Sequence, residues 1–127
     1  MIRILLVEDN ELNRDMLSRR LIRRGCGVRV AEDGAQALRM VLEERPDIVL
    51  MDIGLPDIDG WEVTRRMRAE TTLSGLPILA LTAHAMESDR ELARAAGCDD
   101  FDTKPVEFER LLHKIEALVS RPGTDRP

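Results

Sequence analysis

The chain has few aromatic residues and no long apolar segment. Its 127 residues include no tyrosine, two phenylalanines and one tryptophan, so a core must be built from aliphatic side chains. No segment approaches the ~20 consecutive apolar residues of a membrane-spanning helix. The apolar run at the N-terminus leads into Glu8-Asp9 and has no small-residue cleavage site, so it is not a signal peptide. We therefore expect a cytoplasmic protein that does not bind membranes.

Cysteine and excess positive charge are also scarce. Cys26 and Cys98 lie far apart without metal-ligand spacing, which favours small buried thiols over a disulfide. The net charge of -5 argues against general nucleic-acid binding, which needs a basic surface. Five arginines crowd residues 14–24. They indicate a solvated helix face or, alternatively, a docking surface for an acidic partner.

The length allows one domain, which we expect over residues 1–120, with a disordered tail at 121–127. Apolar strands alternate with helical periodicity five times, which is typical of an α/β protein with a parallel sheet. Continuously apolar strands are expected inside such a sheet, and alternating or polar strands at its edges. This pattern predicts a doubly wound, flavodoxin-like five-stranded sheet of order 2-1-3-4-5 with five helices on both faces. The expected strands are Ile2–Val7, Val28–Val30, Ile48–Met51, Ile78–Leu81 and Asp99–Thr103.

Five helices are expected between and after these strands. The first starts near Asn10, a good N-cap residue, and runs to Gly25. The fourth starts at a capping-box pattern, Ser88 followed by Glu91. The spacing of apolar residues predicts buried stripes at Leu12, Met16, Leu17, Leu21 and Ile22 in the first helix, Leu38, Val41 and Leu42 in the second, Val63 and Met67 in the third, and Phe108, Leu111, Leu112, Ile115, Leu118 and Val119 in the fifth.

Polar residues follow four of the five strands. They are Glu8-Asp9, Asp52, Thr82 and Lys104. In an open parallel sheet, ligands bind outside the carboxyl ends of the strands, so these side chains are expected to meet in one pocket. Three carboxylates close together must take up protons or bind a cation, and hard oxygen ligands favour magnesium. The set predicts a magnesium-assisted phosphoryl site with an aspartate as acceptor.

Each of these residues has an ordinary explanation when it is taken alone. A single Asp after a strand is usually a turn or cap residue, and a Thr there is usually β-branched filler. The combination at corresponding strand ends favours a site. The stretch Asp57–Gly60 superficially matches a calcium loop, but Leu55 stands where another acidic ligand is needed, so we interpret it as a turn.

Residues 2–119 resemble the receiver domain of two-component response regulators, in its single-domain, CheY-like form. The matching segments are Leu6–Asn10, Leu50–Pro56, Asp59-Gly60, Leu81–Ala83, Ala96–Asp100 and Lys104-Pro105.

The resemblance implies a role for each residue of the predicted pocket. Asp52 would accept the phosphoryl group of a phosphohistidine. Asp9 and Asp52 would bind Mg²⁺ directly, Glu8 through water, and Gly54 through its backbone carbonyl. Thr82 would be the switch hydroxyl, Lys104 the phosphate-binding lysine and Phe101 the switch aromatic. The family also often has a cis peptide bond before the residue that matches Pro105. Members of the family differ at the position of His84, and our own hypothesis is that His84 tunes dephosphorylation, the alternative being an exposed loop histidine.

The resulting interpretation is a signalling module with self-phosphorylation and self-dephosphorylation as its only chemistry. Its partners would be a histidine kinase or a histidine phosphotransfer protein, and it would be a monomer or a phosphorylation-dependent dimer. It would be a single-domain regulator, phosphorelay shuttle or phosphate sink, or a receiver excised from a hybrid kinase. A small aspartate-dependent phosphatase is the first alternative, although Asp52-Ile53-Gly54 lacks the second Asp of that class. An FMN-binding protein is the second, although Glu8-Asp9 would repel phosphate.

Overall fold

The computed structural model describes residues 1–83 and 87–120. The expectations for His84 and for the tail at 121–127 therefore lie outside the described residues. The strands are β1 (Arg3–Val7), β2 (Gly27–Ala31), β3 (Ile48–Asp52), β4 (Ile78–Thr82) and β5 (Asp100–Thr103). The helices are α1 (Glu11–Arg23), α2 (Gly34–Glu43), α3 (Gly60–Arg68), α4 (Glu87–Ala96) and α5 (Phe108–Val119), with a short 3-10 helix at Thr71–Leu73.

The five strands form one parallel sheet in the order β2-β1-β3-β4-β5, which confirms the predicted fold class. The register pairs Val7 with Met51 and Asp52 with Leu81, so the carboxyl ends of β1, β3 and β4 lie at the same edge. β2 and β5 are the edge strands, as their less apolar sequences predict.

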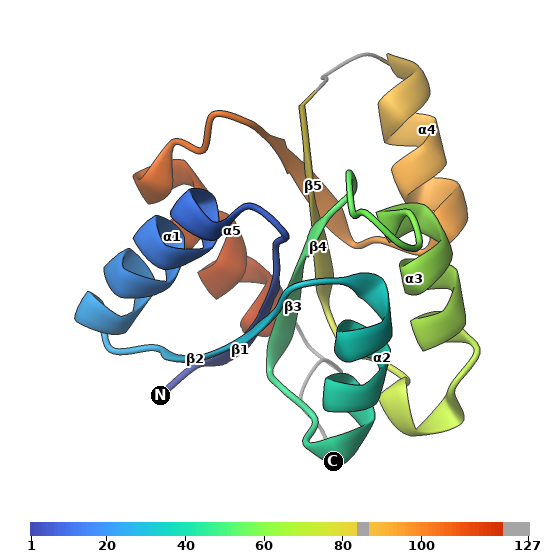
Figure 1. Cartoon of the computed structure of the whole chain (residues 1–127), viewed down its shortest axis with the longest axis horizontal. Coiled ribbons are helices and arrows are strands. Elements are labelled where there is room, and N and C mark those ends of the chain that lie inside the picture. Colours follow the sequence, from blue (N-terminus) through green and yellow to red (C-terminus); the bar gives the residue numbers. More distant parts are fainter. Residues whose placement is uncertain (84–86, 121–127) are drawn as a thin grey trace.

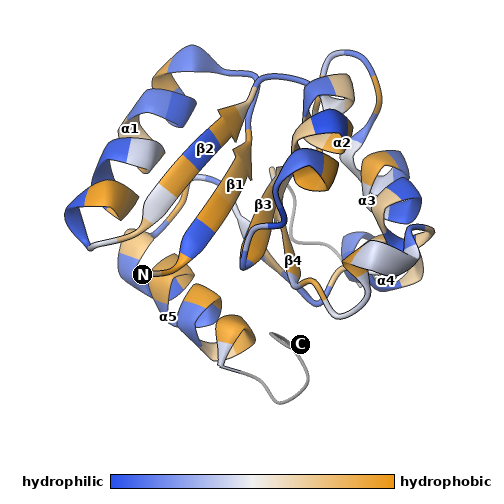
Figure 2. Ribbon diagram, turned by 90° about the horizontal axis from the view of Figure 1, so that it is seen from below, coloured by the Kyte–Doolittle hydropathy of each residue, from blue (hydrophilic) through white to orange (hydrophobic). Residues whose placement is uncertain are grey.

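Helices cover both faces of the sheet: α1 and α5 lie on one side, and α2, α3 and α4 on the other (Figure 1). Alternating strand residues feed two separate cores. Leu6 and Leu50 pack with α1 and α5, whereas Leu5 and Met51 pack with α2 and α3. The central strands are apolar over most of their length, apart from a hydrophilic residue at the start of β1, while the helices carry hydrophilic outer faces (Figure 2). This is the pattern that a sheet covered on both faces requires.

Polar side chains begin most of the helices. Asn10, Asp33, Asp59 and Glu107 are N-cap residues whose side chains accept backbone N–H groups of the first turn. Each satisfies a donor that the helix itself cannot. In the Asp57–Gly60 stretch the chain bends at Asp57 and Ile58, Asp59 is the N-cap of α3, and Gly60 is the first residue of that helix.

Three details of the predicted helices are wrong. In α1 only Leu17 and Leu21 are buried, while Leu12, Met16 and Ile22 are 78%, 58% and 55% exposed. α1 packs mainly against the edge strand β2, so only Leu17 and Leu21, one helical turn apart, reach the core.

In α2, Val41 is buried but Leu42 is 54% exposed, because Leu42 faces away from the sheet. α4 begins at Glu87, so Ser88 already lies within the helix and is not its N-cap. The stripes of α3 and α5 are confirmed, with Val119 only partly buried. Among the described residues, no helix is long and apolar enough to cross a membrane.

Candidate functional site

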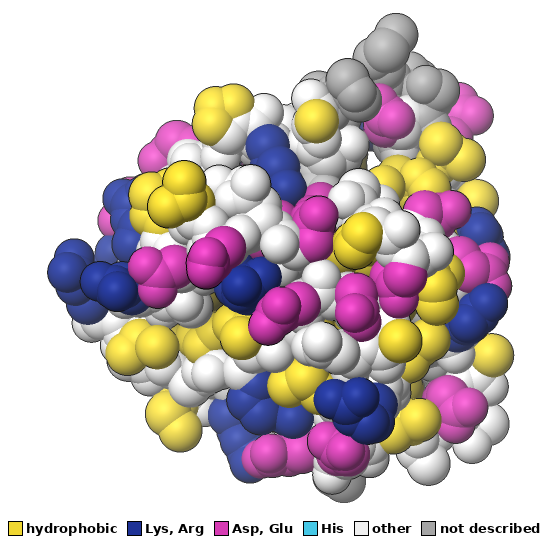
Figure 3. Space-filling model, in the orientation of Figure 1, with side chains coloured by type: hydrophobic (Ala, Val, Ile, Leu, Met, Phe, Trp, Pro, Cys, Tyr) yellow, Lys and Arg dark blue, Asp and Glu magenta, His cyan; other side chains and the backbone are white. Residues whose placement is uncertain are grey.

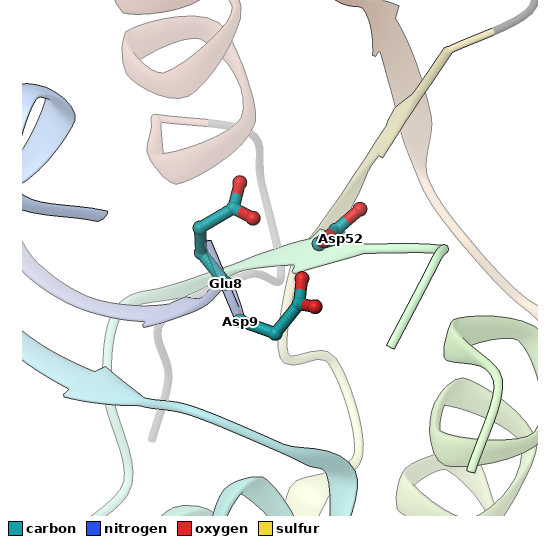
Figure 4. A group of neighbouring side chains, drawn as sticks. All are labelled: Glu8, Asp9 and Asp52. Carbon is teal, nitrogen blue, oxygen red and sulfur yellow. The ribbon is translucent and has the colours of Figure 1, made fainter. Parts of the chain in front are cut away.

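Three carboxylates meet at the carboxyl edge of the sheet. Glu8 and Asp9 follow β1 and Asp52 ends β3, and one oxygen from each lies within 4.8 Å of the others. Figure 4 shows the three side chains rising from neighbouring strand ends. Acidic side chains also gather across the middle of the face seen in Figure 3. The parallel register produces this cluster, because it places the ends of β1 and β3 side by side.

The cluster combines burial with access. Glu8 is 2% and Asp52 5% exposed, whereas Asp9 is exposed. Two charged groups are thus held away from water while the third faces it. The cluster therefore presents one exposed carboxylate beside two buried ones.

Lys104, from the segment after β5, supplies the opposing charge. Its Nζ lies 3.1 Å from Glu8 Oε1 and 3.1 Å from Asp52 Oδ1. Lys104 lies 96 positions after Glu8 in the sequence, so only folding brings the two side chains together. The Lys104–Pro105 peptide bond is cis, as the family resemblance implies.

Burial and charge shift the pKa values of two of these groups. Burial, reinforced by the Asp52 charge, raises the pKa of Glu8, and the Lys104 hydrogen bond only partly offsets this. Burial alone would lower the pKa of Lys104, but Asp52 and Glu8 together outweigh it and raise that pKa. The cluster therefore holds more negative charge than one lysine neutralises.

Backbone donors orient the buried carboxylates. Gly54 N–H donates to Asp52 Oδ1 at 3.1 Å, and Asn10 N–H donates to Glu8 Oε2 at 3.2 Å. Asp52 Oδ1 thus accepts from both Gly54 and Lys104. Asp52 Oδ2 makes no hydrogen bond or ion pair to any residue that the structure describes.

The remaining predicted residues lie around this cluster. Thr82 ends β4, is 6% exposed, and its carbonyl accepts the Lys104 N–H at 2.8 Å. Gly54 lies at the start of the β3–α3 loop and is exposed. Phe101 is half-buried in β5, where the Arg90 guanidinium lies 5.2 Å and Lys114 Nζ 5.9 Å from its ring centre.

The donor set fits a magnesium ion. Three carboxylates and one ammonium leave a charge of −2 when all are ionised, equal and opposite to one divalent cation. All the candidate ligands are oxygens, as Mg²⁺ prefers, and an exposed carboxylate leaves room for waters. The residues present therefore fit the ion.

Sequence reasoning missed one support of this site. Arg14, in α1, donates from Nη1 to the carbonyl oxygens of Glu8 and Asp9 at 3.1 and 3.3 Å. The only sequence signal was its spacing, one helical turn after the N-cap Asn10. A basic residue there can reach back to the preceding loop, but many exposed arginines have the same spacing.

Comparisons with known proteins agree with this geometry. The family model for the response regulator receiver domain matches residues 4–116. The Response regulator MprA of Mycobacterium leprae is 43% identical over 123 residues, which cover 97% of this chain and 53% of that protein. The chain thus spans about half the length of the curated relatives it matches.

Solved structures are similar over almost the whole chain. A putative response regulator from Chloroflexus aurantiacus J-10-fl has a TM-score of 0.90 at 32% identity, over 94% of this chain and 98% of that one. The receiver domain of the sensor histidine kinase PA1611 from Pseudomonas aeruginosa PAO1 has a TM-score of 0.88 at 38% identity, with the same coverage. That structure has a magnesium ion coordinated in its active site cleft.

Proposed function

Because this chain belongs to the response regulator receiver domain family, whose members are phosphoacceptors in two-component signalling, we propose that Asp52 is its acceptor residue. The observation that carries the proposal is the asymmetry of the Asp52 carboxylate. Oδ1 is fixed by Lys104 and Gly54, while Oδ2 is without a partner among the described residues. One oxygen is thus anchored and the other is left to react. The family match, rather than this asymmetry, disfavours the alternative of a small phosphatase.

The chemistry proposed for Asp52 is nucleophilic attack on a phosphohistidine. Asp52 Oδ2 attacks phosphorus, the phosphorus–nitrogen bond breaks, and the imidazole nitrogen keeps the electron pair. Lys104 lies at Oδ1, where it offsets negative charge on the transferred oxygens. The Thr82 hydroxyl, at the end of the adjacent strand, would donate to a phosphoryl oxygen.

Receiver domains bind Mg²⁺ at an acidic site, and we propose Asp9, Asp52 and the Gly54 carbonyl as direct ligands here, with Glu8 acting through water. When bound, the ion would neutralise charge between the acidic cluster and the incoming phosphoryl group. Burial of Glu8 and Asp52 supports this assignment, because their repulsion is relieved by a cation.

The response would pass from the site to β5 and its neighbouring helices. Thr82 would move toward the phosphoryl group, and Phe101, half-buried in β5, would turn into the space released. The exposed surface of α4, β5 and α5 would then change. The Arg90 and Lys114 contacts to the Phe101 ring would have to break or move with it.

Partners are proposed from the surface beside the site. A cavity of about 430 Å³ extends from Glu8 and Lys104 to the half-exposed Met16 and to Pro105. Its lining combines the apolar Leu17 and Val106 with Glu8 and Lys104 of the acidic site, which supports docking of a histidine kinase or a histidine phosphotransfer protein. We further propose a cytoplasmic location, a monomer or a phosphorylation-dependent dimer, and no turnover beyond self-phosphorylation and self-dephosphorylation.

The test is incubation with Mg²⁺ and a small acyl phosphate, followed by intact-mass measurement. We expect the mass of the wild type to rise by one phosphoryl group. It should not rise in the presence of EDTA or in Asp52→Asn. An Asp15→Asn variant removes an exposed carboxylate on α1 and should be modified like the wild type. Equal modification of Asp52→Asn would refute the assignment, and turnover of an added phosphoester would favour the phosphatase.

A further inference from the structure

The loop between β3 and α3 is attached to α2, a helix that supplies none of the three carboxylates of the cluster. Asp57, in this loop, accepts the Gly34 N–H at Oδ1 (2.8 Å) and the Ala35 N–H at Oδ2 (3.0 Å). Both donors belong to the first turn of α2, where helix N–H groups lack partners within the helix. These hydrogen bonds lower the pKa of Asp57, with Gly34 as the largest cause. One carboxylate therefore bridges the loop and the helix start.

The contact at this bridge is close. A Cβ on Gly34 would lie 2.9 Å from Val63 Cγ2, 3.2 Å from Ile58 Cβ and 3.3 Å from Asp57 Oδ1. The loop thus touches α2 directly, and only glycine fits at position 34 without a shift. The other two first-turn amides are satisfied by Asp33, through its side chain to Gln36 N and its carbonyl to Ala37 N.

The same loop carries the proposed carbonyl ligand. Its base is closed by the hydrogen bond from Gly60 N to Ile53 O at 3.0 Å. Between that base and Asp57 lie Gly54 and Pro56, both exposed. Within this stretch, Gly54 is anchored by its N–H to Asp52. Asp57 is therefore the outer anchor of a short segment whose inner anchor is the acceptor aspartate.

We propose that Asp57 is a positioning residue for the magnesium site, and this inference rests on the site proposed above. By holding the loop against α2, Asp57 keeps the Gly54 carbonyl where the ion binds. It does not touch the ion. Residues that orient metal ligands typically change metal affinity by ~10–100-fold when they are removed. Because Asp57 acts through two intervening loop residues, we expect a loss at the low end of this range, about tenfold.

Coupling of this kind is reciprocal. If the clamp strengthens ion binding, ion binding strengthens the clamp by the same factor. Hydrogen exchange at the Gly34 and Ala35 amides should therefore slow when Mg²⁺ is added. A residue that only stabilised α2 would protect these amides equally with and without the ion.

The chain offers a matched control for helix capping. Asp33 is the N-cap of the same helix and carries the same charge, but it lies outside the β3–α3 loop. Asp33→Ala should lower the melting temperature about as much as Asp57→Ala, and leave Mg²⁺ affinity within about twofold of wild type. Asp57→Asn keeps one acceptor oxygen for the two amides, so its affinity should be intermediate.

The experiment is calorimetric titration of the four proteins with Mg²⁺, together with amide exchange at Gly34 and Ala35 measured by NMR. The proposal predicts weaker binding in Asp57→Ala but not in Asp33→Ala, and ion-dependent protection in the wild type that Asp57→Ala loses. Wild-type affinity in Asp57→Ala, or an equal loss in Asp33→Ala, would overturn it. If Asp57→Ala does not fold, Asp57→Asn decides by the same comparison. Absence of Mg²⁺ binding by the wild type would instead refute the proposed site itself.

Discussion

Replacing Asp52 by asparagine is expected to make the metal-free protein more stable, although it removes the proposed acceptor. Asp52 lies within 4.8 Å of Glu8 and Asp9. At that distance, two like charges repel by about 3.5 kcal/mol at an effective dielectric constant of about 20. Two such pairs give about 7 kcal/mol of repulsion, screened in part because Asp9 is exposed.

The attraction that the substitution removes is smaller. Lys104 Nζ lies 3.1 Å from Asp52 Oδ1, which corresponds to about 5 kcal/mol at the same dielectric constant. The asparagine amide has nearly the same shape and keeps an acceptor for Gly54 N–H. The net gain in the free energy of unfolding is therefore about 1–2 kcal/mol, or roughly 4–8 °C in melting temperature for a domain of this size.

Thermal unfolding of both proteins in EDTA and in Mg²⁺ checks this reasoning. At 100 times its dissociation constant, an ion stabilises the folded state by about 2.7 kcal/mol. The wild type should gain that increment and Asp52→Asn much less, so the difference in stability between the two proteins should narrow or change sign in Mg²⁺. An Asp52→Asn protein less stable than wild type in EDTA would show that carboxylate repulsion does not dominate the cluster.

Three further predictions concern other parts of the molecule. Thr82→Ala should still take up the phosphoryl group but show a weak conformational response, because one hydrogen bond to a charged group supplies about 1.5–3 of the roughly 5.5 kcal/mol that a full population shift needs. NMR shifts of Phe101 with and without a phosphoryl analogue measure the response, and a full response in the variant would contradict the prediction. Arg68 donates to the carbonyls of Gly97 and Leu76 and pairs with the largely buried Asp99 at 2.6 Å. Arg68→Ala should therefore lower the free energy of unfolding by about 3 kcal/mol, against less than about 1 kcal/mol for Arg19→Ala, which breaks an exposed pair. Denaturant titrations compare the two variants, and equal losses would contradict the prediction. Burial raises the pKa of Cys98 from 9.0 to about 11, so its contribution to stability is complete below pH 9 and is lost as the pH rises toward 11. The loss of stability between pH 9 and 11 should be smaller in Cys98→Ser, and an identical pH profile of stability in that variant would contradict this role of the thiol.

The sequence allowed the sheet and the acidic cluster to be predicted for one physical reason. Strands covered on both faces are apolar throughout, and they end abruptly where polar groups begin. Glu8, Asp52 and Lys104 each mark such an end, and parallel pairing brings the ends together whatever the intervening sequence. The order of the strands followed from the same contrast, because the polar β5 and the alternating β2 suit the edges.

Helix faces and long-range polar contacts were less predictable. Periodicity gives the direction of an apolar face but not how much of it a neighbour covers, so Leu12 and Ile22 of α1 were wrongly expected in the core. Asp57 gave no local signal of its partners, which lie 22 and 23 residues earlier in the chain. Likewise, the buried Asp102 pairs with Arg110 through the turn after β5, and only the folded geometry shows which arginine is in reach.

The most direct measurement of the central claim is chemical mapping of the modified side chain. After reaction with Mg²⁺ and a small acyl phosphate, borohydride reduces an aspartyl phosphate to the corresponding alcohol and releases phosphate, which leaves homoserine at the reacted position. Peptide mass spectrometry should then find homoserine at residue 52 and intact carboxylates at Glu8 and Asp9. Homoserine at residue 9 with Asp52 unchanged, or no conversion in a protein shown to bind Mg²⁺, would contradict the account.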